Sequence, residues 1–386
     1  MLTIPQGGGS GARSGPLRVT LATSLVTIAG AGAASTTIDG SGIDGVIAAE
    51  AYSNVAVQGM TLTAGALLLG GCVSVDHALF YLADSVVTGC TASSGGGAIF
   101  NEGTLIIARS DIRSSTADFG GGIDNSGMLT LIDSTVEHNV ARRGGGLASA
   151  YGALVTVSGS TIASNTATDG GGVYLSGAAT FVNSTITENA AYDNGGGIST
   201  YGNGASAGLF NVTIVRNRAN EDGDPYGAGS GVYSDAYGAF FVSNSLIADN
   251  VDPTTRHSDD CVGFLSTVGQ NRLGSTPYCG PYGCFPVGIE GCSITTIGGA
   301  NAMLDDPALL GPLHGNGGPT ATVALLPGSN AIDGGDPMQT CTDPNLVPLT
   351  VDQRGFVRPV GASCDIGAYE AGATNPVDAI FANGFD

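Results

Sequence analysis

The chain contains neither tryptophan nor lysine, and only 12% of its 386 residues are charged. Its 12 basic residues, all arginine, stand against 33 acidic ones, so the formal net charge is −21. This balance argues against nucleic acid or an anionic membrane as a partner, whereas cations and neutral sugars are compatible with it. The sequence also lacks an apolar run long enough to span a membrane and any helical hydrophobic period of useful length.

Glycine, by contrast, occurs 64 times. The glycines have no G-X-Y period, which excludes collagen, and a hydrophobic content of 42% argues against disorder. Glycine is favoured where the backbone needs a positive φ or where no side chain fits. The composition therefore predicts a folded protein with many special backbone positions.

The eight cysteines indicate an oxidising compartment, and none has the C-x-x-C spacing of zinc or redox motifs. Near the N-terminus, "LRVTLATSLVTIAGAGAAS" (17–35) has two interpretations. Its arginine, apolar stretch and small residues are those of an export signal, but "VTLATSLVTI" alternates as a strand does. We favour the strand, with residues 1–42 as an N-terminal coil or cap, and leave open as alternatives an export segment or a truncated start.

Two sequence patterns recur in step along the chain. One is a pair of small residues followed by an aliphatic residue, and the other is S/T-x-I/V-x-x-N. Most copies lie 24 to 26 residues apart, with longer steps where "GNGASAG" and "NEDGDPYG" are inserted. A fixed period of this length is typical of a solenoid. The aliphatic positions of the first pattern are Val73, Ile99, Ile123, Leu147, Val173, Ile198 and Val232.

Within each repeat, apolar residues alternate over short stretches rich in Val, Ile and Thr, which predicts short strands. A repeat of about 25 residues cannot bury its own apolar face, so the repeats must stack, each strand pairing in parallel with its equivalent in the next coil. The sequence therefore predicts an all-β fold, a right-handed single-stranded parallel β-helix. Residues 43–250 provide about eight coils at this period.

Two kinds of corner are expected in each coil. Glycine triplets such as 170–172 and 195–197 mark one corner, because glycine allows positive φ and leaves room for the coil above. The asparagines of the second pattern mark another, because asparagine tolerates the left-handed conformation and can bond to the next asparagine in a ladder. We expect a structural role for this ladder, which consists of Asn139, Asn165, Asn189, Asn217 and Asn250.

The stretch "GGGVYLSGAATFVNSTITENAA" (170–191) resembles the repeats of secreted bacterial β-helix proteins with a pectate-lyase-like fold and of polymorphic outer-membrane proteins. "LLGPLHGNGGPTATVALLPGSNAIDGGD" (309–336) and "DQRGFVRPVGASCDIGAYE" (352–370) resemble the C-terminal signature of the choice-of-anchor Q family. "TTIDGSG" (36–42) and "VAVQGMTLTAG" (55–65) resemble that family's N-terminal coils. The resemblance covers nearly the whole chain and implies an exported or surface-attached β-helix, commonly without an assigned activity.

The C-terminal third departs from the repeat. Residues 251–300 form a loop-rich insertion whose four cysteines, Cys261, Cys279, Cys284 and Cys292, allow three pairings. Residues 301–371 are expected to form terminal coils and a cap over the exposed strand edges, and residues 372–386 a tail. A disulfide between Cys341 and Cys364 should hold this cap against the last coil. The polar residues expected to form a buried network there are Asp352, Arg354, Arg358, Asp365 and Glu370.

Cys72 is a separate case, because it occupies the small-residue position of its repeat. We expect either a buried thiol or a local bridge to Cys90.

One group of residues has the types needed for polysaccharide cleavage. Asp118, Arg142, Asp169 and Asp193 precede the glycine corners of successive coils, and stacking should place Asp118, Arg142 and Asp193 along one edge. An arginine flanked by carboxylates could act as a lyase base beside a calcium-bridged uronate. The alternative, which we favour, is a ladder of alternating charge in which Arg142 stays protonated.

Other candidate sites are weaker. Glu221, Asp222 and Asp224 resemble a calcium loop but lack its distal glutamate, so calcium is only an alternative to no cofactor. The four histidines are scattered and are expected to be isolated and solvated. Several tyrosines recur near the glycine corners and form either a sugar-stacking strip or a shield for exposed strands. They are Tyr151, Tyr174, Tyr192, Tyr201, Tyr226 and Tyr233.

These observations favour an extracellular or bacterial surface protein, outer-membrane associated, with a structural or adhesin-like role and no catalytic activity. Carbohydrate or other cell-surface components are the expected partners. A polysaccharide lyase or glycoside hydrolase is the alternative on the same scaffold, and a carbohydrate-binding module is the second alternative.

Overall fold

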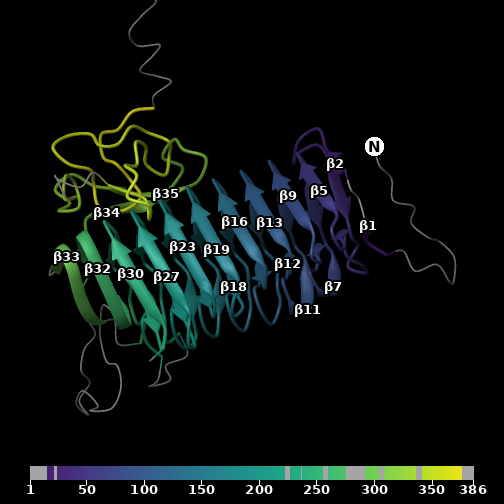
Figure 1. Cartoon of the computed structure of the whole chain (residues 1–386), viewed down its shortest axis with the longest axis horizontal. Coiled ribbons are helices and arrows are strands. Elements are labelled where there is room, and N and C mark those ends of the chain that lie inside the picture. Colours follow the sequence, from purple (N-terminus) through teal and green to yellow (C-terminus); the bar gives the residue numbers. More distant parts are fainter. Residues whose placement is uncertain are drawn as a thin grey trace, which may run out of the picture.

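A computed structural model describes residues 15–20, 24–221, 227–235, 237–254, 260–274, 292–303, 308–335 and 341–375. The chain winds as a right-handed parallel β-helix whose coils stack into a rod, with β1 at one end and β33 at the other (Figure 1). Among these residues there is no helix, and so none that could cross a membrane. The predicted fold is confirmed, and residues 43–250 contain the expected eight coils.

Each coil contributes one strand to each of three faces, and every strand pairs in parallel with its equivalent in the next coil, as Ile99 does with Ile123. The first face follows the glycine corner and consists of β1 (Leu17–Val19), β4 (Ile47–Ala49), β8 (Val73–Val75), β12 (Ile99–Asn101), β15 (Ile123–Asn125), β18 (Leu147–Ser149), β22 (Val173–Leu175), β26 (Ile198–Thr200) and β29 (Val232–Ser234). The second face consists of β2 (Leu25–Ala29), β5 (Asn54–Gln58), β9 (Leu79–Ala83), β13 (Thr104–Ala108), β16 (Met128–Ile132), β19 (Leu154–Ser158), β23 (Ala178–Val182), β27 (Ser206–Phe210) and β30 (Ala239–Ser243). The third face consists of β3 (Thr37–Asp39), β6 (Thr61–Thr63), β10 (Val86–Thr88), β14 (Asp111–Arg113), β17 (Thr135–Glu137), β20 (Thr161–Ala163), β24 (Thr185–Thr187), β28 (Thr213–Val215) and β31 (Leu246–Ala248).

The remaining strands lie at the corners and at the C-terminal end. Four short strands precede the glycine corners: β7 (Ala66–Leu69), β11 (Thr91–Gly95), β21 (Thr166–Ala167) and β25 (Ala190–Ala191). The last coils contain the long strands β32 (Cys261–Leu273) and β33 (Cys292–Met303), which pair in parallel. Beyond them, β34 (Leu310–His314) and β35 (Thr322–Leu325) form an antiparallel pair.

The hydrophobic core runs along the axis of the rod. On the second face alternate residues point inward, so that Leu105, Leu129 and Val155 stack in register and are at most 3% exposed. Ile107, Leu131 and Val157 form the neighbouring row and are also buried. Each coil thus buries its apolar residues against the coils on both sides, which is why a single repeat could not fold alone.

The glycine corners are close-packed. A Cβ atom added to Gly171 would lie 2.4 Å from the carbonyl oxygen of Ala190 in the next coil. Gly170 has a φ of +66°, a conformation that other residues rarely adopt. The predicted reason for the triplets, close approach together with positive φ, is therefore confirmed.

The predicted asparagine ladder is present and lies inside the rod. The Nδ2 atom of Asn139 donates to Oδ1 of Asn165 at 3.0 Å, and the same bond is repeated through each following asparagine up to Asn250. Asn250 ends the ladder by donating to Oδ1 of Asp260 at 2.8 Å. The expected left-handed conformation belongs instead to the preceding residue, such as Glu188 with a φ of 58°. Because that residue makes the turn, the asparagine side chain can point inward.

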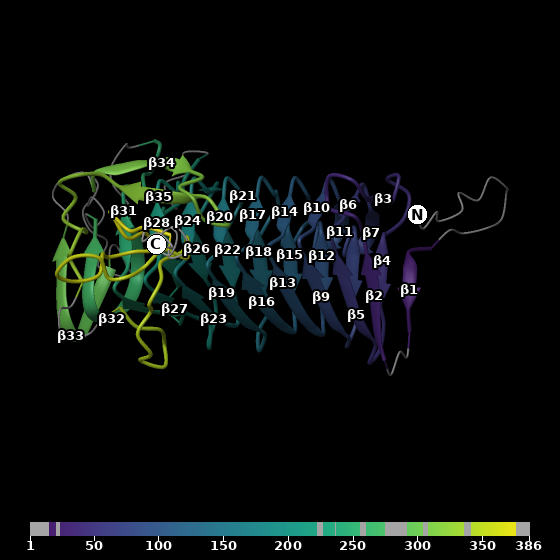
Figure 2. The same cartoon turned by 90° about the horizontal axis from the view of Figure 1, so that it is seen from above.

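The described part of the C-terminal segment lies along the side of the rod. β34, β35 and the chain that follows lie beside the coils near β33 in both views (Figures 1 and 2). The Thr161 hydroxyl donates to the carbonyl of Ala321, and the amides of Asn183 and Asn211 donate to the carbonyls of Val351 and Thr342. Polar side chains at the turn from the second to the third face therefore fix this segment across neighbouring coils.

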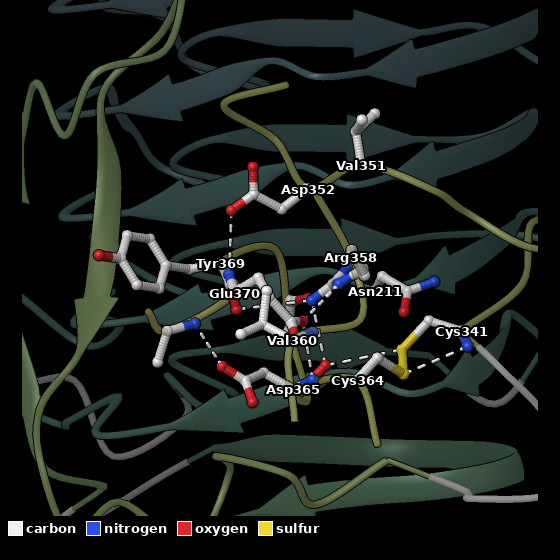
Figure 3. A network of polar contacts seen from close by, with 12 residues as sticks. Asn211, Cys341, Val351, Asp352, Arg358, Val360, Cys364, Asp365, Tyr369 and Glu370 are labelled. Carbon is white, nitrogen blue, oxygen red and sulfur yellow. Dashed lines mark hydrogen bonds and ion pairs between the residues drawn. A yellow bond between two sulfur atoms is a disulfide. The ribbon is translucent and has the colours of Figure 1, made fainter. Parts of the chain in front are cut away.

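The predicted polar network holds this segment together (Figure 3). Arg358 Nε lies 2.9 Å from Glu370 Oε2, and both side chains are fully buried. Arg358 also donates to Oδ1 of Asn183 on the rod at 3.0 Å. Arg354 pairs with Asp352 at 2.6 Å, and the amide of Asp365 donates to Glu370 at 2.9 Å. The network thus joins the segment both to itself and to the turn that follows β23.

Two disulfides agree with the sequence analysis. Cys341 and Cys364 are bonded, with Cα atoms 6.1 Å apart, and Cys72 is bonded to Cys90, with Cα atoms 5.6 Å apart. Cys261, the first residue of β32, is also disulfide-bonded. Cys279 and Cys284 lie outside the described residues, so the choice among the three pairings stays a prediction.

Candidate functional site

The residues expected to form a charged edge lie where the third face turns toward the glycine corner. Arg142 makes two parallel bonds to Asp118 of the preceding coil, from Nε to Oδ1 at 2.7 Å and from Nη2 to Oδ2 at 3.0 Å. The amide of Arg142 donates to the carbonyl of Asp118, so the two residues stand in register. Asp193 is not the next neighbour, because Thr168 occupies the coil between Arg142 and Asp193.

This pairing decides what Arg142 can do. Its hydrogen bond to Asp118 raises the pKa of Arg142 above its ordinary value and lowers the pKa of Asp118. A base must lose its proton before it can take one from a substrate, and an arginine bound by a carboxylate keeps its proton. Arg142 is therefore a fixed positive charge on the rod surface.

Aromatic rings adjoin these arginines. The Arg142 guanidinium lies 4.7 Å from the ring centre of Phe119, and that of Arg143 lies 5.4 Å from the ring centre of Tyr174. Arg143 also approaches Asp169, with Nε 3.9 Å from Oδ2. Cations over aromatic faces are held electrostatically by the ring. The edge is thus an ordered surface of paired charges and rings.

From Tyr174 the aromatic surface continues across the first face. Tyr174 stacks on Tyr201 with ring centres 6.4 Å apart and an angle of 24° between the rings. Tyr233 occupies the outward position that follows Tyr174 and Ser199 in register. Tyr174 is buried, whereas Tyr201 is 55% exposed. We call Arg143, Tyr174, Tyr201 and Tyr233 the tyrosine strip.

The other tyrosines that recur near the glycine corners are not part of the tyrosine strip. Tyr151 is 80% exposed and lies near the loop of Gly204, 3.7 Å from a Cβ atom built there. Tyr192 is also exposed and lies before the glycine corner. Tyr226 lies outside the described residues. Exposed rings beside paired charges can stack on a sugar ring and bond its hydroxyl groups.

The other predicted cation site is only partly described. Glu221 pairs with Arg218 at 2.7 Å, so this carboxylate already has a cationic partner. Asp222 and Asp224 lie outside the described residues. Calcium at this loop therefore stays an untested expectation.

A groove that the sequence analysis did not identify runs past the asparagine corner. It has a volume of about 610 Å³ and spans four coils, from Ser164 to Asp249. Glu188 and Arg216 lie in it, and Arg216 donates from Nη2 to the carbonyl of Leu310 at 3.1 Å. The sequence does indicate which residues line this groove. They are the residues that precede each ladder asparagine, because these point outward whereas the asparagines point inward.

Of the comparisons with known proteins, the family match agrees with the fold. The family described as the right-handed β-helix region matches residues 122–272. No curated protein matches the chain. Among solved structures, the crystal structure of the pectate lyase Pel9A is similar, with a TM-score of 0.41 and 14% sequence identity, over 83% of this chain and 88% of that one. The family match by itself shows a right-handed parallel β-helix of the kind that this family describes.

Proposed function

We propose that the protein is a non-catalytic extracellular rod that binds polysaccharide through its tyrosine strip. The observation that supports the proposal is the exposed ring of Tyr201, which stacks on the buried ring of Tyr174. The guanidinium of Arg143, from the coil before Tyr174, lies over the Tyr174 ring. A ring held in this way loses little conformational freedom when a sugar stacks on it. The protein's shape adds a second argument, because a long polymer can follow the equivalent positions of successive coils.

Paired charges support a binding role over a catalytic one. Glycoside hydrolysis needs two carboxyl groups about 5 to 10 Å apart, one of them able to give a proton. Asp118 in this edge is bound by Arg142, which lowers its pKa and keeps it ionised. An extracellular location is supported by the two disulfides within the described residues, because such bonds persist in oxidising compartments.

Binding can be tested by electrophoresis of the purified protein through gels that contain soluble polysaccharides, both neutral and acidic. We expect at least one polymer to retard the protein, and Tyr201→Ala to reduce the retardation about tenfold in apparent affinity, as loss of a central aromatic contact does. The matched control is Tyr52→Ala, because Tyr52 is 78% exposed but lies on a distant coil. If no polymer retards the wild-type protein, or if both variants behave alike, the proposal fails.

The same preparations distinguish binding from cleavage. We expect neither unsaturated sugar products nor new reducing ends from pectate or alginate in the presence of calcium. Turnover that Arg142→Ala abolishes would instead favour the lyase. Because Arg142 is exposed and outside the core, this variant should remain folded.

A further inference from the structure

A second cluster of chemically reactive side chains lies near the other end of the rod, at the turn from the first to the second face. Asp76, His77 and Glu102 each offer a ligand atom, and these atoms all lie within 4.8 Å of one another. His77 Nδ1 lies 2.6 Å from Asp76 Oδ1. The expectation that the histidines are isolated is therefore wrong for His77.

The coils place these residues in register. Asp76 follows β8 and Glu102 follows β12, and their amides donate to the carbonyls of Ala49 and Val75 in the respective preceding coils. The carbonyl of His77 accepts a bond from the amide of Tyr52 at 3.0 Å. Backbone ladders thus hold the three side chains on neighbouring coils, and no ligand is needed to bring them together.

The carboxylates of this cluster lack the cationic partners that others on the rod have. Asp84 pairs with Arg109 and Asp118 with Arg142. Within the described part of the chain, Asp76 has only His77 as a partner, and the Glu102 side chain has no hydrogen bond or ion pair. A cluster of acidic groups without a neutralising arginine is suited to a cation.

A buried hydroxyl group gives an independent reason to expect a ligand. His77 and Glu102 line a cavity of about 470 Å³, together with Tyr52 and Ser53. Ser53 is fully buried, and its Oγ has no hydrogen-bond partner among the described residues. Buried polar atoms are nearly always paired, so an unpaired one that lines a cavity indicates a missing partner there.

We propose that Asp76, His77 and Glu102 bind a divalent transition-metal ion such as Zn²⁺, whose open coordination position faces the cavity of Ser53. One imidazole and two carboxylates suit zinc, whereas calcium prefers oxygen ligands alone. Zinc binds such ligands at about 2 Å, which puts them up to about 4 Å apart. Small rotations of these exposed side chains are enough to reach that separation from the observed one. Three protein ligands leave room for water or for an oxygen-bearing molecule that also reaches Ser53.

Calorimetric titration of the chelator-treated full-length protein with Zn²⁺ tests this directly, and Co²⁺ provides a visible absorption spectrum as a second readout. We expect one ion to bind per chain, and His77→Asn and Glu102→Gln each to weaken binding about tenfold or more. Both residues are exposed, so thermal unfolding without metal should be unchanged in either variant.

The matched control is His138→Asn. His138 also lies beside a carboxylate of its own coil, with Nδ1 3.7 Å from Glu137 Oε2, but among the described residues it is not part of a three-ligand group. This variant should bind zinc as the wild type does. Absence of binding, equal loss in the control, or Ca²⁺ binding more tightly than Zn²⁺ would overturn the proposal.

Discussion

An asparagine in the interior of a β-helix can satisfy its amide group only if a suitable partner stands one coil away. Asn189 shows how this is done. Its Nδ2 donates to Asn217 and to the carbonyl of Ile162, both at 2.9 Å, while its Oδ1 accepts from the backbone and side-chain nitrogens of Asn165. Each residue of the ladder therefore depends on its neighbours, and the ladder ends on Asp260, which can only accept when ionised.

We expect Asn189→Ala to lower the free energy of unfolding by about 2 to 4 kcal/mol, because buried donors and acceptors on both sides lose their partners. Urea denaturation followed by circular dichroism measures this. Asn345→Ala serves as the control, because Asn345 is exposed and bonds only locally. A similar loss in both variants would show that the ladder contributes no special stability.

A second residue-scale prediction concerns pH. Burial, and next the charge of Glu102, raise the pKa of Asp124 from 3.8 to about 7. The folded state therefore favours the protonated carboxyl, so its contribution to stability is complete below the unfolded pKa and is lost as pH rises to about 7.

The measurement is the free energy of unfolding between about pH 4 and 7 for the wild type and for Asp124→Asn. We expect Asp124→Asn to reduce the loss of stability as pH rises through this range. An unchanged slope would mean that Asp124 is not the group responsible.

At the scale of elements, the strands and the corners have different requirements. A strand such as β16 needs only alternation, because each inward residue packs on an aliphatic residue of the next coil. A glycine corner instead needs the absence of a side chain. The carbonyl oxygen of Ala190 lies too close to Gly171 for any Cβ atom, and it belongs to backbone that the ladder of coils holds in place.

Gly171→Ala should therefore destabilise the protein by about 3 kcal/mol, the upper range for overpacking, because backbone of the next coil must move. Gly315→Ala is the matched control, since a Cβ atom there would meet nothing within 4 Å. We expect it to change stability by no more than about 0.5 kcal/mol. Thermal unfolding of the two variants provides the comparison, and equal melting temperatures would contradict the packing argument.

At the scale of the whole molecule, the C-terminal segment ties several coils together from outside. It bonds to turns of successive coils through Thr161, Asn183 and Asn211. A solenoid is otherwise stabilised mainly between neighbouring coils, so a segment that spans several of them couples their unfolding. The buried pair of Arg358 and Glu370 holds the segment in shape at the point where Arg358 also reaches Asn183.

Arg358→Met should lower the free energy of unfolding by about 3 to 5 kcal/mol, because Glu370 is left buried without its cation. The segment 341–375 should become sensitive to limited proteolysis in this variant. Arg109→Met is the control, since the pair of Arg109 and Asp84 is exposed and contributes no more than about 1 kcal/mol. Unchanged proteolysis in Arg358→Met would show that the network does not retain the segment.

The repeat made most of the fold predictable. A period of about 25 residues indicates which residues lie above one another, so it predicted the asparagine ladder and the glycine corners. For Cys72 it left two alternatives, a buried thiol and a bridge to Cys90, and the structure has the bridge. The same period also indicates the cluster of Asp76, His77 and Glu102, because it places Glu102 one coil away from Asp76. No short-range motif marks this cluster, because stacking brings residues of separate coils to within about 5 Å of one another.

The sequence alone determined the right-handed coil, the direction of its strands and the identity of its corners, because these depend on local alternation and on a repeated spacing. Only the tertiary structure decided where the chain beyond residue 308 lies and which surface residues pair. That segment has no repeat, so its sequence does not indicate which of its residues lie beside which coil of the rod. Its position is set by unsatisfied polar groups at the turns, such as Asn183 and Asn211, which bond to its backbone carbonyls once the coils have formed.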